Sequence, residues 1–110
     1  LPMVIICDEY TASAGEIFVS CLRDYETEGL IDDVVIVGQT TFGKGIMQGS
    51  VEYPKDQSYA TLTVAYYNPP SGVNYHGIGI APDVEVVLGE TEDTQLAEAI
   101  KQMKILLESK

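Results

Sequence analysis

Two short apolar runs with a helical pattern between them open the chain. Residues 2–7 and 34–37 are continuously apolar and rich in β-branched side chains, which is typical of strands buried on both faces. Between these runs, residues 14–25 place apolar side chains at helical spacing, so we expect Ile17 and Cys21 on the buried face of a helix. A strand, a helix and a strand within about 36 residues predict a right-handed βαβ crossover between parallel strands.

The second half of the chain has a different pattern. Residues 46–53 and 58–67 have strand-like compositions, and the segment 54–57 between them is typical of a turn, so they predict a β-hairpin. Residues 84–87 predict a short strand, and residues 92–108 predict a helix. The apolar stripe that we expect to face the core on this helix comprises Leu96, Ala99, Ile100, Met103 and Leu107. The chain is therefore expected to have an α/β fold, with no linker that would divide it into domains.

Length, charge and cysteine content limit what the chain can do. One hundred and ten residues, 45% of them hydrophobic, suffice for one modest core. A net charge of −11 argues against binding nucleic acid or an anionic membrane through charge. Cys7 and Cys21 are too few for a disulfide framework and lack metal-site spacing, so we expect two buried thiols. A single histidine, His76, cannot build a histidine-rich metal site. We expect the chain to bind no metal and no other cofactor.

Ser13 stands at the junction between the first strand and the first helix, where small neighbours leave its hydroxyl uncovered. Ala12, Ala14 and Gly15 surround it, so another molecule can approach the oxygen closely. A serine nucleophile needs a base to take its proton and a donor for the oxyanion, and the N–H of Ala14 at the helix start suits the second role. The alternative is structural, because Ser13 and Glu16 also have the S-x-x-E spacing of a capping box, which composition alone favours over catalysis.

Lys44 and His76 are the two residues considered as the base. His76 has no supporting feature around it, and an exposed or structural histidine is the simpler interpretation. Lys44 stands between Gly43 and Gly45, and this permissive backbone would let its side chain point into a cleft. Burial there would favour the neutral amine, which can accept a proton. The alternative for these residues is an ordinary turn, and they lack the spacing of a Walker A phosphate loop.

Gln48 follows Lys44 by four residues. If residues 46–53 are extended, positions 44, 46 and 48 share one face of the strand. The amide of Gln48 would then accept a hydrogen bond from the lysine and orient it. The alternative is a glutamine on the surface of a strand.

Four stretches of the chain, taken together and in order, resemble the carboxyl-terminal processing (tail-specific) serine peptidases. They are Tyr10-Thr-Ala-Ser-Ala-Gly-Glu-Ile17; Val35-Ile-Val-Gly-Gln-Thr-Thr-Phe-Gly-Lys-Gly45 with Gln48; Ala65-Tyr-Tyr-Asn-Pro-Pro-Ser-Gly72; and Gly77-Ile-Gly-Ile-Ala-Pro-Asp83. The resemblance implies a partial crotonase/Clp-protease-like β/α spiral, with residues 1–110 as the C-terminal part of the catalytic domain. The PDZ module and the upstream glycine-rich oxyanion segment of the family are not expected within these residues.

The resemblance also implies residue roles and substrates. By motif position Ser13 is expected to be the nucleophile, Lys44 the general base and Gln48 the residue that orients the lysine. Peptide bonds near protein C-termini would be hydrolysed through an acyl-enzyme, with apolar C-terminal tails as the substrates and the periplasm or cell envelope as the location.

Two alternatives to a serine peptidase remain open at this point. One is a non-catalytic peptide-binding or assembly module that retains the fold. The other is a crotonase-like enzyme acting on acyl-coenzyme A, which would not need Lys44. Because a partial domain leaves strand edges and apolar faces uncovered, we also expect the chain to self-associate.

Overall fold

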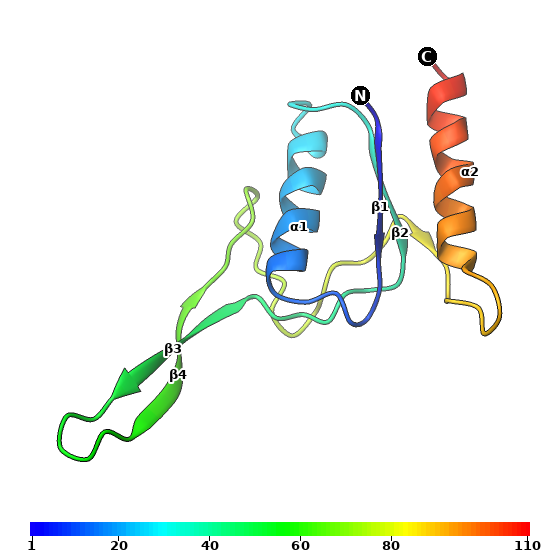
Figure 1. The fold of residues 1–110 in the computed structure, drawn as a ribbon. Helices are drawn as coiled ribbons and strands as arrows, with labels where there is room; N and C mark the ends of the chain where they lie inside the picture. Colours follow the sequence, from blue (N-terminus) through cyan, green and yellow to red (C-terminus); the bar gives the residue numbers. More distant parts are fainter.

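The computed structural model describes residues 1–110 and contains every element that the sequence predicts (Figure 1). The elements are β1 (Met3–Cys7), α1 (Ala14–Thr27), β2 (Val34–Gly38), β3 (Ile46–Glu52), β4 (Tyr59–Tyr66), β5 (Val84–Glu85) and α2 (Thr94–Glu108). The last strand is shorter than the expected 84–87, and the last helix begins two residues later than expected, because the Asp93 side chain caps it by accepting from Leu96 N–H at 2.9 Å. Neither helix is long and apolar enough to cross a membrane.

Strands β1, β2 and β5 form a three-stranded parallel sheet with a helix on either side. The strand order is β1-β2-β5, and β1 pairs with β2 in parallel from Met3↔Val34 to Cys7↔Gly38. Figure 1 shows the sheet lying between α1 and α2, and α2 contacts both β1 and β2. The predicted parallel βαβ unit is therefore confirmed, and its connections bring the loops after β1 and β2 to the same end of the sheet.

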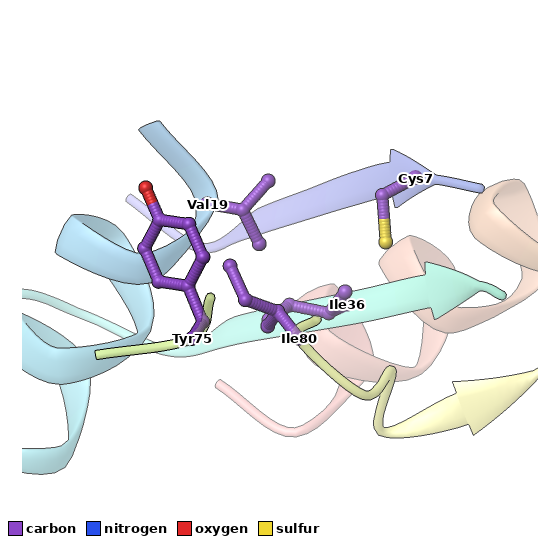
Figure 2. Packing of buried hydrophobic residues seen from close by; sticks show 5 residues of the cluster. All are labelled: Cys7, Val19, Ile36, Tyr75 and Ile80. Atoms are coloured by element: carbon purple, nitrogen blue, oxygen red, sulfur yellow. The ribbon is translucent and has the colours of Figure 1, made fainter. Parts of the chain in front are cut away.

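A small core holds this sheet to α1. The buried apolar cluster consists of Cys7, Val19, Ile36, Tyr75 and Ile80 (Figure 2). Strands β1 and β2 and helix α1 each supply one of these residues, and the segment between β4 and β5 supplies the other two. Burial, together with the charges of Asp8 and Asp83, raises the pKa of the Cys7 thiol to about 11, so it stays protonated. Cys21 is only half-buried, which corrects the expectation of two buried thiols.

The buried face of α1 differs from the predicted one. The residues of this helix that are buried are Glu16, Val19, Ser20 and Asp24. Ile17 and Cys21 are only half-buried, because two carboxylates rather than an apolar stripe turn toward the loops that cover the helix. Asp24 Oδ2 accepts from Ser71 N–H at 3.1 Å, and Asp24 Oδ1 accepts from Arg23 Nε at 3.2 Å. Burial acts to raise the pKa of Asp24, but these hydrogen bonds outweigh it and hold the pKa below its usual value.

The predicted stripe of α2 is also only partly correct. Ala99 is buried and Met103 is half-buried, whereas Leu96, Ile100 and Leu107 are each about half exposed. The physical reason is Gln95, which is 4% exposed and donates through Nε2 to the Val86 carbonyl at 3.0 Å. That bond sets the rotation of the helix and turns part of the apolar stripe outward.

Strands β3 and β4 form an antiparallel hairpin that projects away from the sheet and helices (Figure 1). The chain consequently extends over 64 × 38 × 20 Å, and its radius of gyration is 17.5 Å. A compact domain of this length would have a radius of gyration of about 13 Å. Apolar side chains of the hairpin, including Tyr59, Leu62 and Tyr66, are more than half exposed. Of these three, Tyr66 meets the ring of His76 edge-on.

The small core makes stability sensitive to its central residue. The Ile36 side chain is 0% exposed. We expect Ile36→Ala to lower the free energy of unfolding by about 2–5 kcal/mol, because the substitution removes buried apolar groups and leaves a cavity in the core. Ile105→Ala on α2 is the matched control, since that side chain is 49% exposed and its truncation should cost less than about 1 kcal/mol. Urea denaturation measures both, and equal losses would contradict the assignment of the core.

Candidate functional site

Ser13 occupies a strained backbone position between β1 and α1. Its φ of 53° and ψ of −113° lie in a region that residues with a side chain rarely adopt. By position Ser13 and Glu16 form the expected capping box, and Glu16 Oε2 accepts from Ser13 N–H at 2.9 Å. The Ser13 hydroxyl makes no hydrogen bond that caps the helix. Strain of this kind is common at functional sites, and here it leaves the hydroxyl available to another group.

The N–H of Ala14 is the predicted oxyanion donor, and it lies beside Ser13 at the first position of α1. The nearest backbone hydrogen bonds run from Gly15 N–H to Ala12 O at 3.1 Å and from Ile17 N–H to Ser13 O at 3.0 Å. The Ala14 N–H has no acceptor within the chain. An unpaired donor at the positive end of a helix suits a developing negative charge, so the role stays a prediction with suitable geometry.

The loop that carries Lys44 lies against the loop that carries Ser13. Phe42 N–H donates to Thr11 O at 2.9 Å, which joins the two segments directly. Gly43 has a φ of +90°, and a Cβ there would stand 3.0 Å from Gly79 N, so only glycine fits this close crossing. The Lys44 side chain is half-buried, and its ammonium makes no ion pair or hydrogen bond, with Ser13 or with any other residue. The fold thus brings the two candidate loops together without bonding the two reactive groups.

Gln48 lies in β3, exposed, directly after an irregularity in the hairpin. Met47 pairs with Ala65 and Gln48 pairs with Thr63, so the register shifts between them. Gln48 makes no hydrogen bond to Lys44, and its orienting role stays a prediction. His76 is exposed as well, with its ring edge-on to Tyr66 at 6.3 Å between centroids.

Glu16, which the sequence predicts only as part of a helix cap, is a further residue of the site. Its side chain is 0% exposed and connects both candidate loops. Oε1 accepts from the Thr41 hydroxyl and from Gly43 N–H, each at 2.6 Å. Oε2 accepts from Lys44 N–H at 2.8 Å and from Ser13 N–H at 2.9 Å. A single carboxylate therefore binds the backbone of both the proposed nucleophile and the proposed base.

Thr41 and Tyr75 complete the surroundings of this carboxylate. The Thr41 hydroxyl donates to Glu16 and accepts from Ile80 N–H at 2.8 Å, which adds the segment before β5 to the network. The Tyr75 hydroxyl is buried without a hydrogen-bond partner. Burial, and then the charge of Glu16, raises the pKa of Tyr75, so the phenol remains protonated.

Comparisons with known proteins agree on one family. The model of peptidase family S41 matches residues 1–86. The C-terminal processing peptidase of Tetradesmus obliquus chloroplasts is 40% identical over 85 residues, which cover 77% of this chain and 17% of that protein. Carboxyl-terminal-processing peptidase 3 of Arabidopsis thaliana chloroplasts is 37% identical over 102 residues, which cover 93% of this chain and 18% of that protein.

A solved structure gives the same result for the fold. The photosystem II D1 C-terminal processing protease superposes with a TM-score of 0.64 at 38% identity, over 77% of this chain and 20% of that one. The expected fold class is therefore confirmed: the chain has the α/β fold of a segment of these proteases. The chain spans about a fifth of the length of the relatives that it matches.

The Glu16 network predicts a large stability loss on truncation. Glu16→Ala leaves four buried or part-buried donors without their acceptor, and each unsatisfied donor costs about 1–3 kcal/mol, so we expect the free energy of unfolding to fall by about 3 kcal/mol or more. Glu16→Gln keeps the side-chain volume and one acceptor oxygen, so its free energy of unfolding should lie between that of the unsubstituted chain and that of Glu16→Ala.

Glu108→Ala is the control for this measurement, because that exposed side chain makes no hydrogen bond and its loss should cost less than about 0.5 kcal/mol. Urea unfolding followed by circular dichroism compares the three variants. If Glu16→Ala were as stable as the control, the network would not be holding the two loops.

Proposed function

The chain belongs to peptidase family S41, and from this premise we propose that the protein carrying it is a serine peptidase that cleaves near protein C-termini. The observation that carries the proposal is the buried carboxylate of Glu16, which binds the backbone N–H groups of both Ser13 and Lys44. Two residues far apart in sequence are held in neighbouring loops at one end of the sheet. One of them supplies a hydroxyl and the other an amine, which are the parts of a Ser–Lys pair.

In the proposed mechanism the Ser13 oxygen attacks the carbonyl carbon of the scissile peptide bond. Lys44, as the neutral amine, accepts the hydroxyl proton, and the N–H of Ala14 donates to the oxyanion that forms. Collapse of this tetrahedral intermediate breaks the C–N bond, and the departing amine takes the proton from Lys44. An ester on Ser13 remains. Water then attacks this ester with Lys44 again as the base, which releases the carboxylic acid product and restores the serine.

Gln48 is given a supporting part in this mechanism. We propose that its side-chain oxygen accepts a hydrogen bond from the Lys44 amine and so orients the lone pair toward Ser13. Gln48 lies four residues after Lys44, at an exposed position of β3, and its side chain is free to turn toward the lysine.

The substrates are inferred from the relatives. Those relatives carry the names of C-terminal processing peptidases of chloroplasts, and one solved structure is the processing protease of the photosystem II D1 protein. We infer that this protein likewise acts on protein or peptide substrates at their C-termini, with apolar tails preferred, in an extracytoplasmic compartment such as the periplasm or cell envelope.

A non-catalytic peptide-binding or assembly module is the alternative function. The observation in its favour is that the Ser13 hydroxyl and the Lys44 ammonium are not hydrogen-bonded to each other. A fluorophosphonate probe separates the two proposals, because it reacts with activated serines and forms a covalent bond to their oxygen. Labelling of Ser13 in the full-length protein supports the peptidase, and absence of labelling supports the module.

The peptidase proposal predicts the effect of two substitutions in the full-length protein. Ser13→Ala and Lys44→Ala should each reduce kcat for a fluorogenic peptide with an apolar C-terminus by about 10³-fold or more. The reason is that removing one member of a catalytic unit disables the whole unit. Ser58→Ala in the hairpin turn and Lys104→Ala on α2 are matched controls and should retain activity. Near-normal turnover by Lys44→Ala would remove the lysine from the role of base.

The exposed apolar hairpin predicts that residues 1–110, prepared alone, self-associate. At high micromolar concentration we expect sedimentation velocity to show dimers or larger species, because burying Leu62 and its neighbours removes apolar surface from water. Leu62→Glu should weaken the association more than Thr61→Glu, which adds the same charge at the next position of β4. A single monomeric species in the unsubstituted chain would contradict the prediction.

A further inference from the structure

Asn74 joins three separate parts of the chain through one side-chain amide. Its Nδ2 lies 2.6 Å from the carbonyl oxygen of Tyr67, 3.1 Å from that of Gly45 and 3.2 Å from Oδ1 of Asn68. Its Oδ1 accepts from His76 N–H at 2.8 Å. The residue therefore connects the end of β4, the backbone next to Lys44 and the segment that leads into the core.

The partners of Asn74 require an amide at this position. The NH₂ group faces oxygen acceptors and the oxygen faces an N–H donor, so the orientation of the amide follows from its surroundings. A carboxylate of the same shape would accept only, and it would place negative charge against two carbonyl oxygens. An aspartate substitution therefore tests the donors without changing the volume.

The contacts of Asn74 lie on the side of Lys44 that Glu16 does not reach. Glu16 binds the N–H groups of Gly43 and Lys44, and so fixes the backbone that precedes the lysine side chain. On the following side, the Gly45 carbonyl accepts both from Tyr67 N–H at 2.8 Å and from Asn74. The Gly43–Lys44 peptide unit is thus anchored on one side and the Gly45–Ile46 unit on the other, with only the Lys44–Gly45 unit between them.

Gly45 has no side chain because Asn74 occupies that space. A Cβ at this position would stand 3.0 Å from Asn74 Oδ1 and 3.0 Å from His76 N, closer than real Cβ contacts ordinarily come. Gly45 therefore permits the side-chain amide of Asn74 to approach the backbone next to Lys44 closely.

We propose that Asn74 is a positioning residue for Lys44, which rests on the proposed function of Lys44 as the base. Its side chain makes no hydrogen bond to Ser13 or to the side chain of Lys44. It acts through the Gly45 carbonyl, and together with Glu16 it sets the direction in which the lysine side chain leaves the loop. Misplacement of a catalytic group by about 1 Å can cost about 100-fold in rate, so a backbone clamp of this kind affects turnover directly.

The test uses Asn74→Ala and Asn74→Asp in the full-length protein, with cleavage of an apolar-tailed fluorogenic peptide as the assay. We expect kcat to fall by about 10- to 100-fold with KM changed by less than about twofold, because the base moves while the substrate contacts remain. The acid limb of the kcat/KM pH profile should also shift, since it reports the free-enzyme base. Val73→Ala is the matched control: it truncates the adjacent residue, whose side chain is 68% exposed and makes no hydrogen bond to Gly45 or Asn74.

Three results would overturn the proposal. In the first, a folded Asn74→Asp or Asn74→Ala protein has the kcat and pH profile of the unsubstituted enzyme. In the second, Val73→Ala loses as much turnover as the Asn74 variants. In the third, activity falls only in proportion to the folded fraction measured by thermal unfolding, or both variants fail to fold, which would make Asn74 a structural residue. Failure of the proposed function is recognised separately, because Ser13→Ala or Lys44→Ala would then retain cleavage.

Discussion

The buried carboxylate of Glu16 is the interaction on which the rest of the site depends. A carboxylate removed from water is costly unless hydrogen bonds replace its hydration. Glu16 receives four of them, from one hydroxyl and three backbone N–H groups, and it lies in the first turn of α1 where the helix dipole favours negative charge. Three of its donors lie 25 to 28 residues further along the chain, in the loop of Thr41, Gly43 and Lys44, and the fourth is the Ser13 N–H, three residues before it. The same contacts that make the charge tolerable therefore fix the relative positions of the loops.

Glu16 also explains why α1 buries a polar face. The helix can satisfy Glu16 and Asp24 only by turning both toward the segments that donate to them, around residues 41–44 and 71. The apolar residues one position further along then lie toward the outside. The strain at Ser13 belongs to the same arrangement, because the unusual backbone angles there accompany a hydrogen bond from the Ser13 N–H to the carboxylate.

The sequence predicted the elements well because their signals are local. Apolar runs, the strand-like composition of β4 and a helical pattern each depend on neighbours within a few residues, and the βαβ connection follows from their order. The buried faces of both helices were less predictable, since Glu16 and Gln95 have partners that lie far along the chain. Nor did the sequence reveal that Glu16 links both candidate loops, because S-x-x-E spacing describes a helix start and carries no information on Thr41 or Gly43.

The β3–β4 hairpin is connected to the backbone around Lys44 through the hydrogen bonds of Asn74. It leaves the body of the chain at Gly45 and returns at Tyr67, and these are the two residues whose carbonyls Asn74 binds. Gly45 directly follows Lys44, so any displacement of the hairpin reaches the lysine through this point. The apolar side chains of the hairpin remain largely exposed in the chain itself. Asn74 and Glu16 therefore hold the backbone around the lysine at the point where the hairpin begins, so that the hairpin ends and the Ser13 loop share one hydrogen-bonded base.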